Sequence, residues 1–372
     1  MLLPPFDYQP RTRLVFGNGA LTRVGELARE IGGTRVLIVS DPGIVKAGYV
    51  VRAAAYLREA GLDIRVFGDV HENPSTEDVA RCVEVAKEFK IDLIVGLGGG
   101  SSMDTAKGCN FILTNGGRMQ DYWGIGKATK PMLPLIAIPT TAGTGSECQS
   151  FALISNAETH VKMACGDPKA AARIAILDPE LTVSQPKRVT VCTGIDAISH
   201  ALETAVTNKR TAFSSVYSLE AFRLCHASFS HVLRHPKDLD ARGRMLLGAA
   251  YAGTAIENSM LGAAHACANP LTAKFDVVHG EAVGVMLPHV IRFNSALTEI
   301  ALIYKSLYDG DLSSRIEELL KEAQMPRRIR HYGVREKDIL PLAEMAALQW
   351  TAQFNPRPLT VEDFVSLYRA AL

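Results

Sequence analysis

We predict that this sequence folds into two domains, an α/β domain with a Rossmann-like parallel sheet over residues 1–183 and an all-α domain over residues 184–372. Up to about residue 180, short β-branched runs alternate with amphipathic stretches, which is typical of βαβ units. After Asp178-Pro179, apolar residues instead recur with the 3.6-residue period of helices. A length of 372 residues also favours two domains over one core.

The elements of the first domain follow from the period of their apolar residues. Buried or half-buried strands are predicted at residues 35–39, 63–67, 92–96, 135–138, 151–155 and 172–177. Amphipathic helices are predicted between them, at residues 44–60 and 75–90. This order favours a mostly parallel sheet of the nucleotide-binding type.

The second domain shows helical periodicity throughout. The predicted helices include residues 186–206, 211–233, 238–257, 260–273 and 281–293. Between residues 243 and 271 these helices are rich in Gly and Ala, which lets backbones approach closely around a buried site. Ordinary tight helix packing explains the same composition.

The composition limits the partners and the compartment. A formal charge of +1 gives no electrostatic case for binding nucleic acid or an anionic membrane surface. The seven cysteines are odd in number, scattered and without a Cys-x-x-Cys pair, which predicts free thiols in a reducing, cytoplasmic setting. The N-terminus lacks signal-peptide features, and no apolar run reaches the length of a membrane helix.

The stretch 194–203 carries the first half of a candidate metal site. In a helix, Asp196 and His200 stand at i and i+4, so a carboxylate and an imidazole can converge on one point. His265 and His279 could complete a four-ligand shell. Nitrogen and oxygen ligands of this kind suit Zn²⁺ or Fe²⁺ better than Mg²⁺ or Ca²⁺. Spacing alone leaves a hydrogen-bonded pair as the alternative.

The segment Gly96-Leu-Gly-Gly-Gly-Ser-Ser-Met-Asp-Thr-Ala-Lys107 follows a predicted strand and opens a predicted helix. Glycines without Cβ atoms let the backbone approach a diphosphate, and the helix start supplies N–H donors and positive dipole. The spacing differs from the usual Gly-x-Gly-x-x-Gly fingerprint and indicates a phosphate cradle of some kind. A tight turn with Ser101 and Asp104 as a capping box is also consistent with it.

Two further features support the binding of a nucleotide cofactor in the first domain. Asp41 follows the strand at residues 35–39, where a carboxylate can bind an adenosine ribose and repel a 2′-phosphate, which favours NAD over NADP. An Asx turn before Pro42 explains the same residue. The segment 139–147, Pro-Thr-Thr-Ala-Gly-Thr-Gly-Ser-Glu, offers hydroxyls and glycines for phosphate or nicotinamide, although an ordinary loop has a similar composition.

Taken together, these residues resemble the iron-containing (group III) alcohol dehydrogenase family, which shares its general architecture with dehydroquinate synthase-like enzymes. The resemblance covers nearly the whole chain. The matching motifs are Phe16-Gly-Asn-Gly19, Asn73-Pro-Ser75, 98–107, 139–147, Lys162-Met163, Asp178-Pro179, 194–203 and 265–289.

The resemblance implies two sets of site residues. The cofactor would contact Asp41, Asn73, Gly99, Gly100, Ser101, Thr140, Thr141, Thr144, Lys162 and Leu181, and the glycine loop adds Gly98, Ser102 and Asp104. The metal would be bound by Asp196, His200, His265 and His279.

One position departs from the family pattern. Many of these enzymes carry a His-x-x-x-His-Pro segment whose second histidine is thought to pass a proton toward solvent. Here the segment is His265-Ala-Cys-Ala-Asn-Pro270. Because the amide of Asn269 does not titrate, it cannot serve as general acid or base. Either water or the nicotinamide ribose hydroxyl relays the proton instead, or Asn269 mainly orients a polar substrate.

The resemblance implies an NAD- and divalent-metal-dependent (Fe²⁺ or Zn²⁺) alcohol dehydrogenase that interconverts a primary or secondary alcohol and its carbonyl compound by hydride transfer. The expected partners are a small-molecule substrate and a second copy of the chain, as a homodimer or higher even oligomer. A sugar-acid or hydroxy-acid oxidoreductase of the same family is an alternative.

Two other classes of protein remain as alternatives. A dehydroquinate synthase-like NAD and metal lyase would need basic residues beside the metal ligands, and Lys274 is the nearest one in the sequence. A non-catalytic nucleotide-binding protein is disfavoured, because an unpaired buried Asp among three His would be costly to keep.

Overall fold

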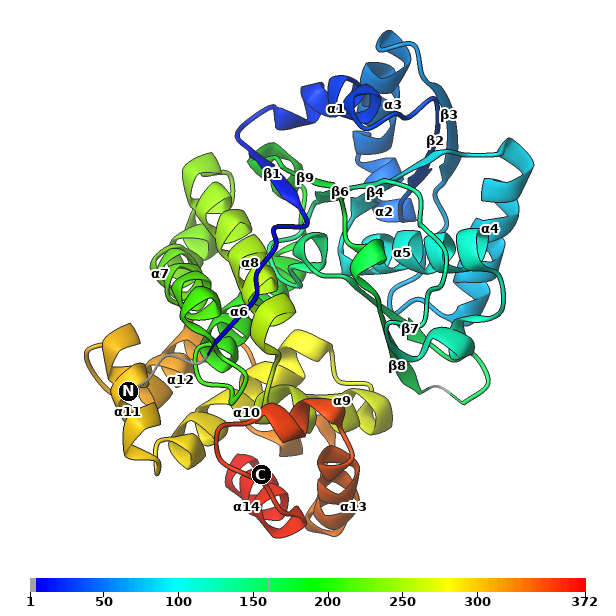
Figure 1. Ribbon diagram of the computed structural model, residues 1–372. Coiled ribbons are helices and arrows are strands. Elements are labelled where there is room, and N and C mark those ends of the chain that lie inside the picture. Colours follow the sequence, from blue (N-terminus) through cyan, green and yellow to red (C-terminus); the bar gives the residue numbers. More distant parts are fainter. Residues whose placement is uncertain (1–4, 160) are drawn as a thin grey trace. The chain divides into compact units, whose positions relative to one another are not determined.

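A computed structural model of the protein describes residues 5–159 and 161–372 (Figure 1). Residues 1–4 belong to the N-terminal stretch in which no signal peptide is expected, and they lie outside the described residues. The contacts within the chain define two compact units. One is an α/β unit, Gln9–Gln185, and the other is a helical unit that combines Pro186–Leu372 with the N-terminal segment ending at Tyr8.

The α/β unit is built on a six-stranded parallel sheet, which confirms the predicted fold class. Its order is β1-β9-β6-β4-β2-β3. The strands are β1 (Arg13–Phe16), β2 (Arg35–Val39), β3 (Asp63–Phe67), β4 (Leu93–Gly98), β6 (Leu135–Pro139) and β9 (Ile174–Leu177). A second sheet of order β5-β8-β7 contains β5 (Gly124–Ile125), β7 (Phe151–Ser155) and β8 (Lys162–Gly166).

Helices cover both faces of the parallel sheet because its strands are apolar on both sides. On β2, Val36 and Ile38 face a core with α1 (Val24–Glu30) and α3 (Tyr49–Glu59). Leu37 and Val39 face the opposite core with α4 (Thr76–Phe89) and α5 (Gly100–Asn115). Figure 1 shows the strands between these helix pairs.

One predicted helix of the α/β unit is wrong. The stretch 44–60 forms two helices, α2 (Pro42–Lys46) and α3, separated at Gly48, whose φ of 83° is left-handed and ends α2.

Both units also contain short 3₁₀ helices. They are η1 (Ala20–Arg23), η2 (Met119–Tyr122), η3 (Ser146–Cys148), η4 (Pro168–Ala170), η5 (Pro179–Thr182), η6 (Ile329–Tyr332) and η7 (Trp350–Phe354).

The helical unit surrounds α6, whose residues from Gly194 to Thr204 are all buried. Helices α7, α8 and α10 pack against it. The helices of this unit are α6 (Lys187–Thr204), α7 (Ala212–Arg234), α8 (Leu239–Ser259), α9 (Ala263–Phe275), α10 (His279–Asn294), α11 (Thr298–Leu307), α12 (Leu312–Glu322), α13 (Glu336–Ala347) and α14 (Val361–Ala371). Near the N-terminus, the ring of Tyr8 stacks on Phe213 of α7 with centroids 3.5 Å apart.

The cysteines and the lengths of the helices agree with what the composition predicts. All seven cysteines are free thiols and are buried. Across residues 5–159 and 161–372, none of the helices combines the length and the apolar character that spanning a membrane requires.

Candidate metal and cofactor sites

Three helices bring the candidate metal ligands together. Asp196 and His200 lie one turn apart on the buried face of α6, and each is 4% exposed. His265 lies in the first turn of α9, and His279 is the first residue of α10. Next to His279, a Cβ on Gly280 would overlap the carbonyl group of Cys192, so glycine permits the close approach of α10 to α6.

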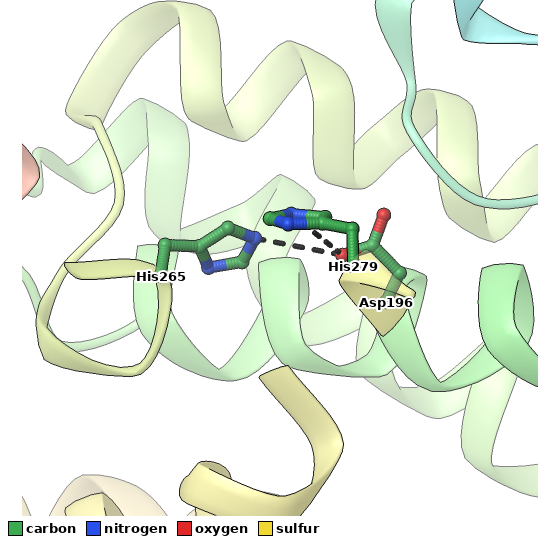
Figure 2. A group of neighbouring side chains, drawn as sticks. All are labelled: Asp196, His265 and His279. Atoms are coloured by element: carbon green, nitrogen blue, oxygen red, sulfur yellow. Dashed lines mark ion pairs between the residues drawn. The ribbon is translucent and has the colours of Figure 1, made fainter. Parts of the chain in front are cut away.

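The donor atoms converge on one carboxylate oxygen. Asp196 Oδ1 lies 3.4 Å from His200 Nε2, 3.5 Å from His265 Nε2 and 3.9 Å from His279 Nε2. Figure 2 shows the rings of His265 and His279 directed toward Asp196. The ligand atoms of Asp196, His265 and His279 all lie within 4.8 Å of one another.

These separations fit a shared metal ion better than hydrogen bonds. Ligand atoms about 2.1 Å from a tetrahedral Zn²⁺ lie about 3.4 Å from one another. The separations are longer than normal hydrogen bonds, and within the part of the chain that the structure describes, Asp196 Oδ1 and His265 Nε2 have no hydrogen-bond partner. Buried polar atoms left in this way indicate a site for a cation.

The carboxylates control the protonation of the cluster. Burial alone would raise the pKa of Asp196, but His200, His265 and His279 lower it well below its usual value. Burial lowers the pKa of His265, whereas the carboxylates of Glu203 and Asp196 raise it to a net value of about 9. The lowered pKa of Asp196 and the raised pKa of His265 both favour a positive charge at this point, which a divalent cation would supply in exchange for a proton.

Among the residues around the candidate ligands, the sequence identified Asn269 and missed Glu203 and Gln349. Asn269 lies one turn beyond His265 on α9, and its Nδ2 donates to Gln349 Oε1 at 2.9 Å. Glu203, on the same helix as Asp196 and His200, contacts His265 Nδ1 with its carboxylate. The spacing 196, 200 and 203 puts Glu203 on the same face of α6, which was a usable signal. Gln349 has no such signal, because it reaches Asn269 from 80 residues away.

The glycine loop joins the end of β4 to the start of α5. Gly98 has φ 153°, and a Cβ there would overlap Ser102 Oγ, so only glycine fits. A Cβ on Gly100 would lie 2.9 Å from Thr144 Cγ2. The absence of a side chain at Gly100 therefore allows the two predicted cofactor loops to lie in contact. A Cβ on Gly99 would lie 3.5 Å from Thr141 Cγ2. The glycines therefore let the side chains of Ser102, Thr141 and Thr144 pack closely against this loop.

The capping box predicted for Ser101 and Asp104 is wrong. Helix α5 begins at Gly100 with Gly99 as its N-cap, and no side chain among the described residues caps it. Asp104 instead accepts a hydrogen bond from Ser146 Oγ at 2.8 Å, and burial raises its pKa. An uncapped start of a 16-residue helix leaves its dipole and first N–H groups available to a phosphate.

Asp41 forms the Asx turn that its position predicts and also lies beside the glycine loop, whereas its contact with a ribose stays a prediction. Its Oδ1 accepts from the backbone N–H of Ile44 and caps α2, as in an Asx turn. Its Oδ2 accepts from Ser102 Oγ at 3.2 Å, which places the carboxylate beside the glycine loop. Lys162 and Asn73 also come together, with Lys162 Nζ 3.4 Å from Asn73 Oδ1.

The remaining predicted cofactor residues lie beside the second loop or in the core. Thr140 is 1% exposed, and its Oγ1 has no hydrogen-bond partner among the described residues. Leu181 is fully buried in the hydrophobic core that also contains Ile174 and Ile176 of β9, and its predicted contact with the cofactor stays a prediction.

A buried network beneath this loop was not predicted. Lys107 is fully buried, and its Nζ donates to Ser146 O, Ser146 Oγ and Phe151 O at 2.6–2.9 Å. Glu147 is 1% exposed, and burial raises its pKa to about 7 against the opposing effects of its backbone N–H group and Lys107. These residues fix the base of the loop.

Comparison with known proteins agrees with this architecture. Residues 10–179 match the family described as iron-containing alcohol dehydrogenase, and residues 190–372 match the C-terminal domain of the Fe-containing alcohol dehydrogenase family. The NAD-dependent methanol dehydrogenase of Bacillus methanolicus is 35% identical over 371 residues, covering 96% of this chain and 97% of that protein.

Two solved structures are also similar. The crystal structure of a 1,3-propanediol oxidoreductase has a TM-score of 0.96 at 32% identity and covers 99% of this chain and 100% of that one. The sulfoacetaldehyde reductase of Bifidobacterium kashiwanohense in complex with NAD⁺ has a TM-score of 0.89 at 27% identity, over 100% and 99% of the two chains.

The Rossmann-like unit, the helical unit and these relatives define an oxidoreductase of the alcohol dehydrogenase class. The chain belongs to the iron-containing alcohol dehydrogenase family.

Proposed function

We propose that the protein is an NAD- and divalent-metal-dependent dehydrogenase that interconverts a small alcohol and its aldehyde or ketone. The observation that carries this proposal is that nitrogen atoms of three imidazoles lie 3.4–3.9 Å from Asp196 Oδ1. Asp196 Oδ1 and His265 Nε2 are buried and lack hydrogen-bond partners among the described residues. Relatives named for methanol and 1,3-propanediol support small alcohols as the substrate class.

Each unit contributes one part of the chemistry. Asp196, His200, His265 and His279 would hold the metal, which supplies Lewis acidity that lowers the pKa of an alcohol and polarises a carbonyl. The bound nicotinamide supplies the hydride acceptor or donor. The loop of Gly98, Gly99 and Gly100 would bind the diphosphate with backbone N–H groups, and Asp41 would bind the ribose and disfavour a 2′-phosphate.

Asn269 gives the site its distinctive feature. It cannot exchange a proton near neutral pH, so the proton of the alcohol would leave through water or a cofactor hydroxyl. The amide, held by Gln349, would instead offer a fixed hydrogen-bonding group to a polar substrate. This supports a hydroxylated substrate, such as a diol or hydroxy acid, as a second candidate.

The test combines metal analysis with a substrate panel. Asp196→Ala and His200→Ala should lose bound metal and NADH formation together, measured by elemental analysis and absorbance at 340 nm. Retained turnover in a metal-free variant would refute the assignment. Turnover of dehydroquinate synthase substrates without net NADH would favour the lyase, which the family matches do not support.

Two expectations about the whole protein stay predictions. Residues 1–183 would form the cofactor domain and residues 184–372 the metal domain, and the protein would be a cytoplasmic homodimer or higher even oligomer. Light scattering of the purified protein measures the oligomeric state directly.

A further inference from the structure

The carboxylate of Glu203 is fixed beside the candidate metal ligands. It lies on α6 and is 4% exposed. One oxygen contacts His265 Nδ1, and the other accepts from the backbone N–H of Ala264 at 2.7 Å. A buried carboxylate without such partners would cost several kcal/mol. Both oxygens are therefore held, and both partners belong to α9.

The contact with Nδ1 determines which nitrogen of His265 can bind a metal. A carboxylate only accepts, so in a neutral imidazole Nδ1 must carry the proton. The lone pair is then on Nε2. This is the atom that lies 3.5 Å from Asp196 Oδ1 and that lacks a hydrogen-bond partner among the described residues. Glu203 thus turns the coordinating side of the ring toward Asp196.

The second contact determines where α9 begins. Its N-cap, Gly262, provides no side-chain cap. Instead, Glu203 Oε1 accepts from Ala264 N, and Asn355 Oδ1 accepts from Ala263 N at 3.4 Å. A Cβ on Gly262 would lie 3.2 Å from both acceptor oxygens, so glycine allows them to approach. A negative charge at this helix start is also favourable.

We propose that Glu203 is a positioning residue that holds His265 in the tautomer and orientation that bind metal through Nε2. The inference rests on the metal site proposed above. A carboxylate behind a metal-binding imidazole also makes the ring a stronger donor, and loss of such a partner typically weakens metal binding about 10- to 100-fold.

The test is Glu203→Gln. The variant keeps the size of the side chain but can donate an N–H to Nδ1, which favours the tautomer protonated on Nε2. We expect the Kd for Co²⁺ and Zn²⁺, measured by the visible absorption of Co²⁺ and by chelator competition, to rise about 10- to 100-fold. An unchanged Kd would overturn the proposal.

A second measurement does not depend on the variant folding. In ¹⁵N NMR spectra of the Zn²⁺-loaded wild-type protein, His265 should be protonated on Nδ1 and coordinated through Nε2. Coordination through Nδ1 would overturn the proposal. If the wild-type protein binds no divalent metal, the metal site itself is wrong and this inference falls with it. If the wild-type protein binds metal and Glu203→Gln binds it equally well, only the role of Glu203 is wrong.

The helical unit contains a matched control. Asp238 also has one oxygen on an imidazole, His231 Nε2 at 2.8 Å, and the other on a backbone N–H at a helix start, Ala241 at 3.0 Å. Asp238→Asn removes equivalent contacts outside the metal cluster. Its Kd for Co²⁺ should stay within about twofold of the wild-type value, because none of its partners is a candidate ligand. A Kd raised as much as in Glu203→Gln would attribute both effects to general destabilisation and overturn the proposal.

Discussion

At the scale of single residues, substitution of Asn269 tests whether proton transfer can be changed without changing metal binding. The residue lies one helical turn from His265 and is hydrogen-bonded to Gln349. Asn269→His would introduce a group with an unperturbed pKa near 6.5. We expect the pH profile of kcat to gain a limb in that region while the metal content stays the same. Stopped-flow or steady-state rates between pH 5.5 and 9 measure this.

A control is needed because the substitution also breaks the hydrogen bond to Gln349. Gln349→Ala removes the same bond and adds no titrating group. Its pH profile should keep the wild-type shape. If Asn269→His and Gln349→Ala change the profile in the same way, the effect comes from the lost hydrogen bond and not from proton transfer.

The raised pKa of Glu147 predicts that the stability of the α/β unit depends on pH. Its folded pKa, about 7, lies above the ordinary value of 4.5 for a glutamate, so the folded state holds the proton more tightly than the unfolded state. This contribution is full below about pH 4.5 and is lost as the pH rises to about 7, which amounts to about 3 kcal/mol. Between pH 5 and pH 8, the wild-type protein should therefore lose more stability than Glu147→Gln does.

Denaturant unfolding at the two pH values measures the difference. Glu158→Gln is the control, because Glu158 is an exposed carboxylate of the same unit. It should follow the wild-type protein. Equal losses for the wild-type protein and Glu147→Gln would show that Glu147 does not hold the proton in the folded state.

The sequence could predict contacts between residues that are close in the chain, but not contacts between residues far apart in it. Asp196 and His200 are one turn apart, so their spacing alone brought them together, and the structure gives 3.4 Å between their ligand atoms. The contacts of Glu203 with His265 and of Asn269 with Gln349 span 62 and 80 residues. No local period encodes such pairs, because they exist only once the helices pack.

Among the elements, α10 depends on one close backbone approach. A Cβ on Gly280 would overlap the carbonyl group of Cys192, and backbone atoms cannot move aside without shifting a helix. Gly280→Ala should therefore displace the start of α10 and His279 with it. We expect metal affinity to fall at least tenfold and the unfolding temperature to drop, as measured by chelator competition and calorimetry.

Gly284→Ala, on the same helix, is the matched comparison. Its Cβ would lie 2.9 Å from Ile195 Cγ2 and 3.0 Å from Leu320 Cδ2, which are side-chain methyl groups and not backbone atoms. This variant should lose stability but keep its metal affinity closer to that of the wild-type protein. Equal losses of affinity would show that the position of α10 is not specific to Gly280.

Helices were predicted correctly where the periodic stretch of sequence is long. The five predicted helices of the second domain correspond to α6 through α10, because each repeats its apolar residues over several turns. The edge strand β1 was missed because it is only four residues long and three of them are at least partly exposed. The break at Gly48 was missed because the apolar period continues on both sides of it.

At the scale of the whole molecule, each unit should respond to its own ligand. Binding to the folded state adds stability, about 2.7 kcal/mol at a ligand concentration one hundred times Kd. Chelating the metal should lower the unfolding temperature of the helical unit, whereas NAD should raise that of the α/β unit. Calorimetry with each ligand alone measures both shifts.

Local probes assign each transition to a unit. Trp123 lies in the α/β unit and Trp350 in the helical unit, so single-tryptophan variants report on them separately. Stabilisation of Trp350 unfolding by NAD alone, in the absence of metal, would contradict this division of binding sites.

The stacking of Tyr8 on Phe213 also has a consequence for synthesis. The ribosome makes Tyr8 about 200 residues before its partner. At roughly 5–20 residues per second, the first segment waits roughly 10–40 s for a docking surface to emerge. The whole α/β unit is translated during that interval, so attachment of the N-terminal segment is a late step. A bulky fusion at the N-terminus would therefore interfere with folding of the helical unit and leave folding of the parallel sheet unaffected.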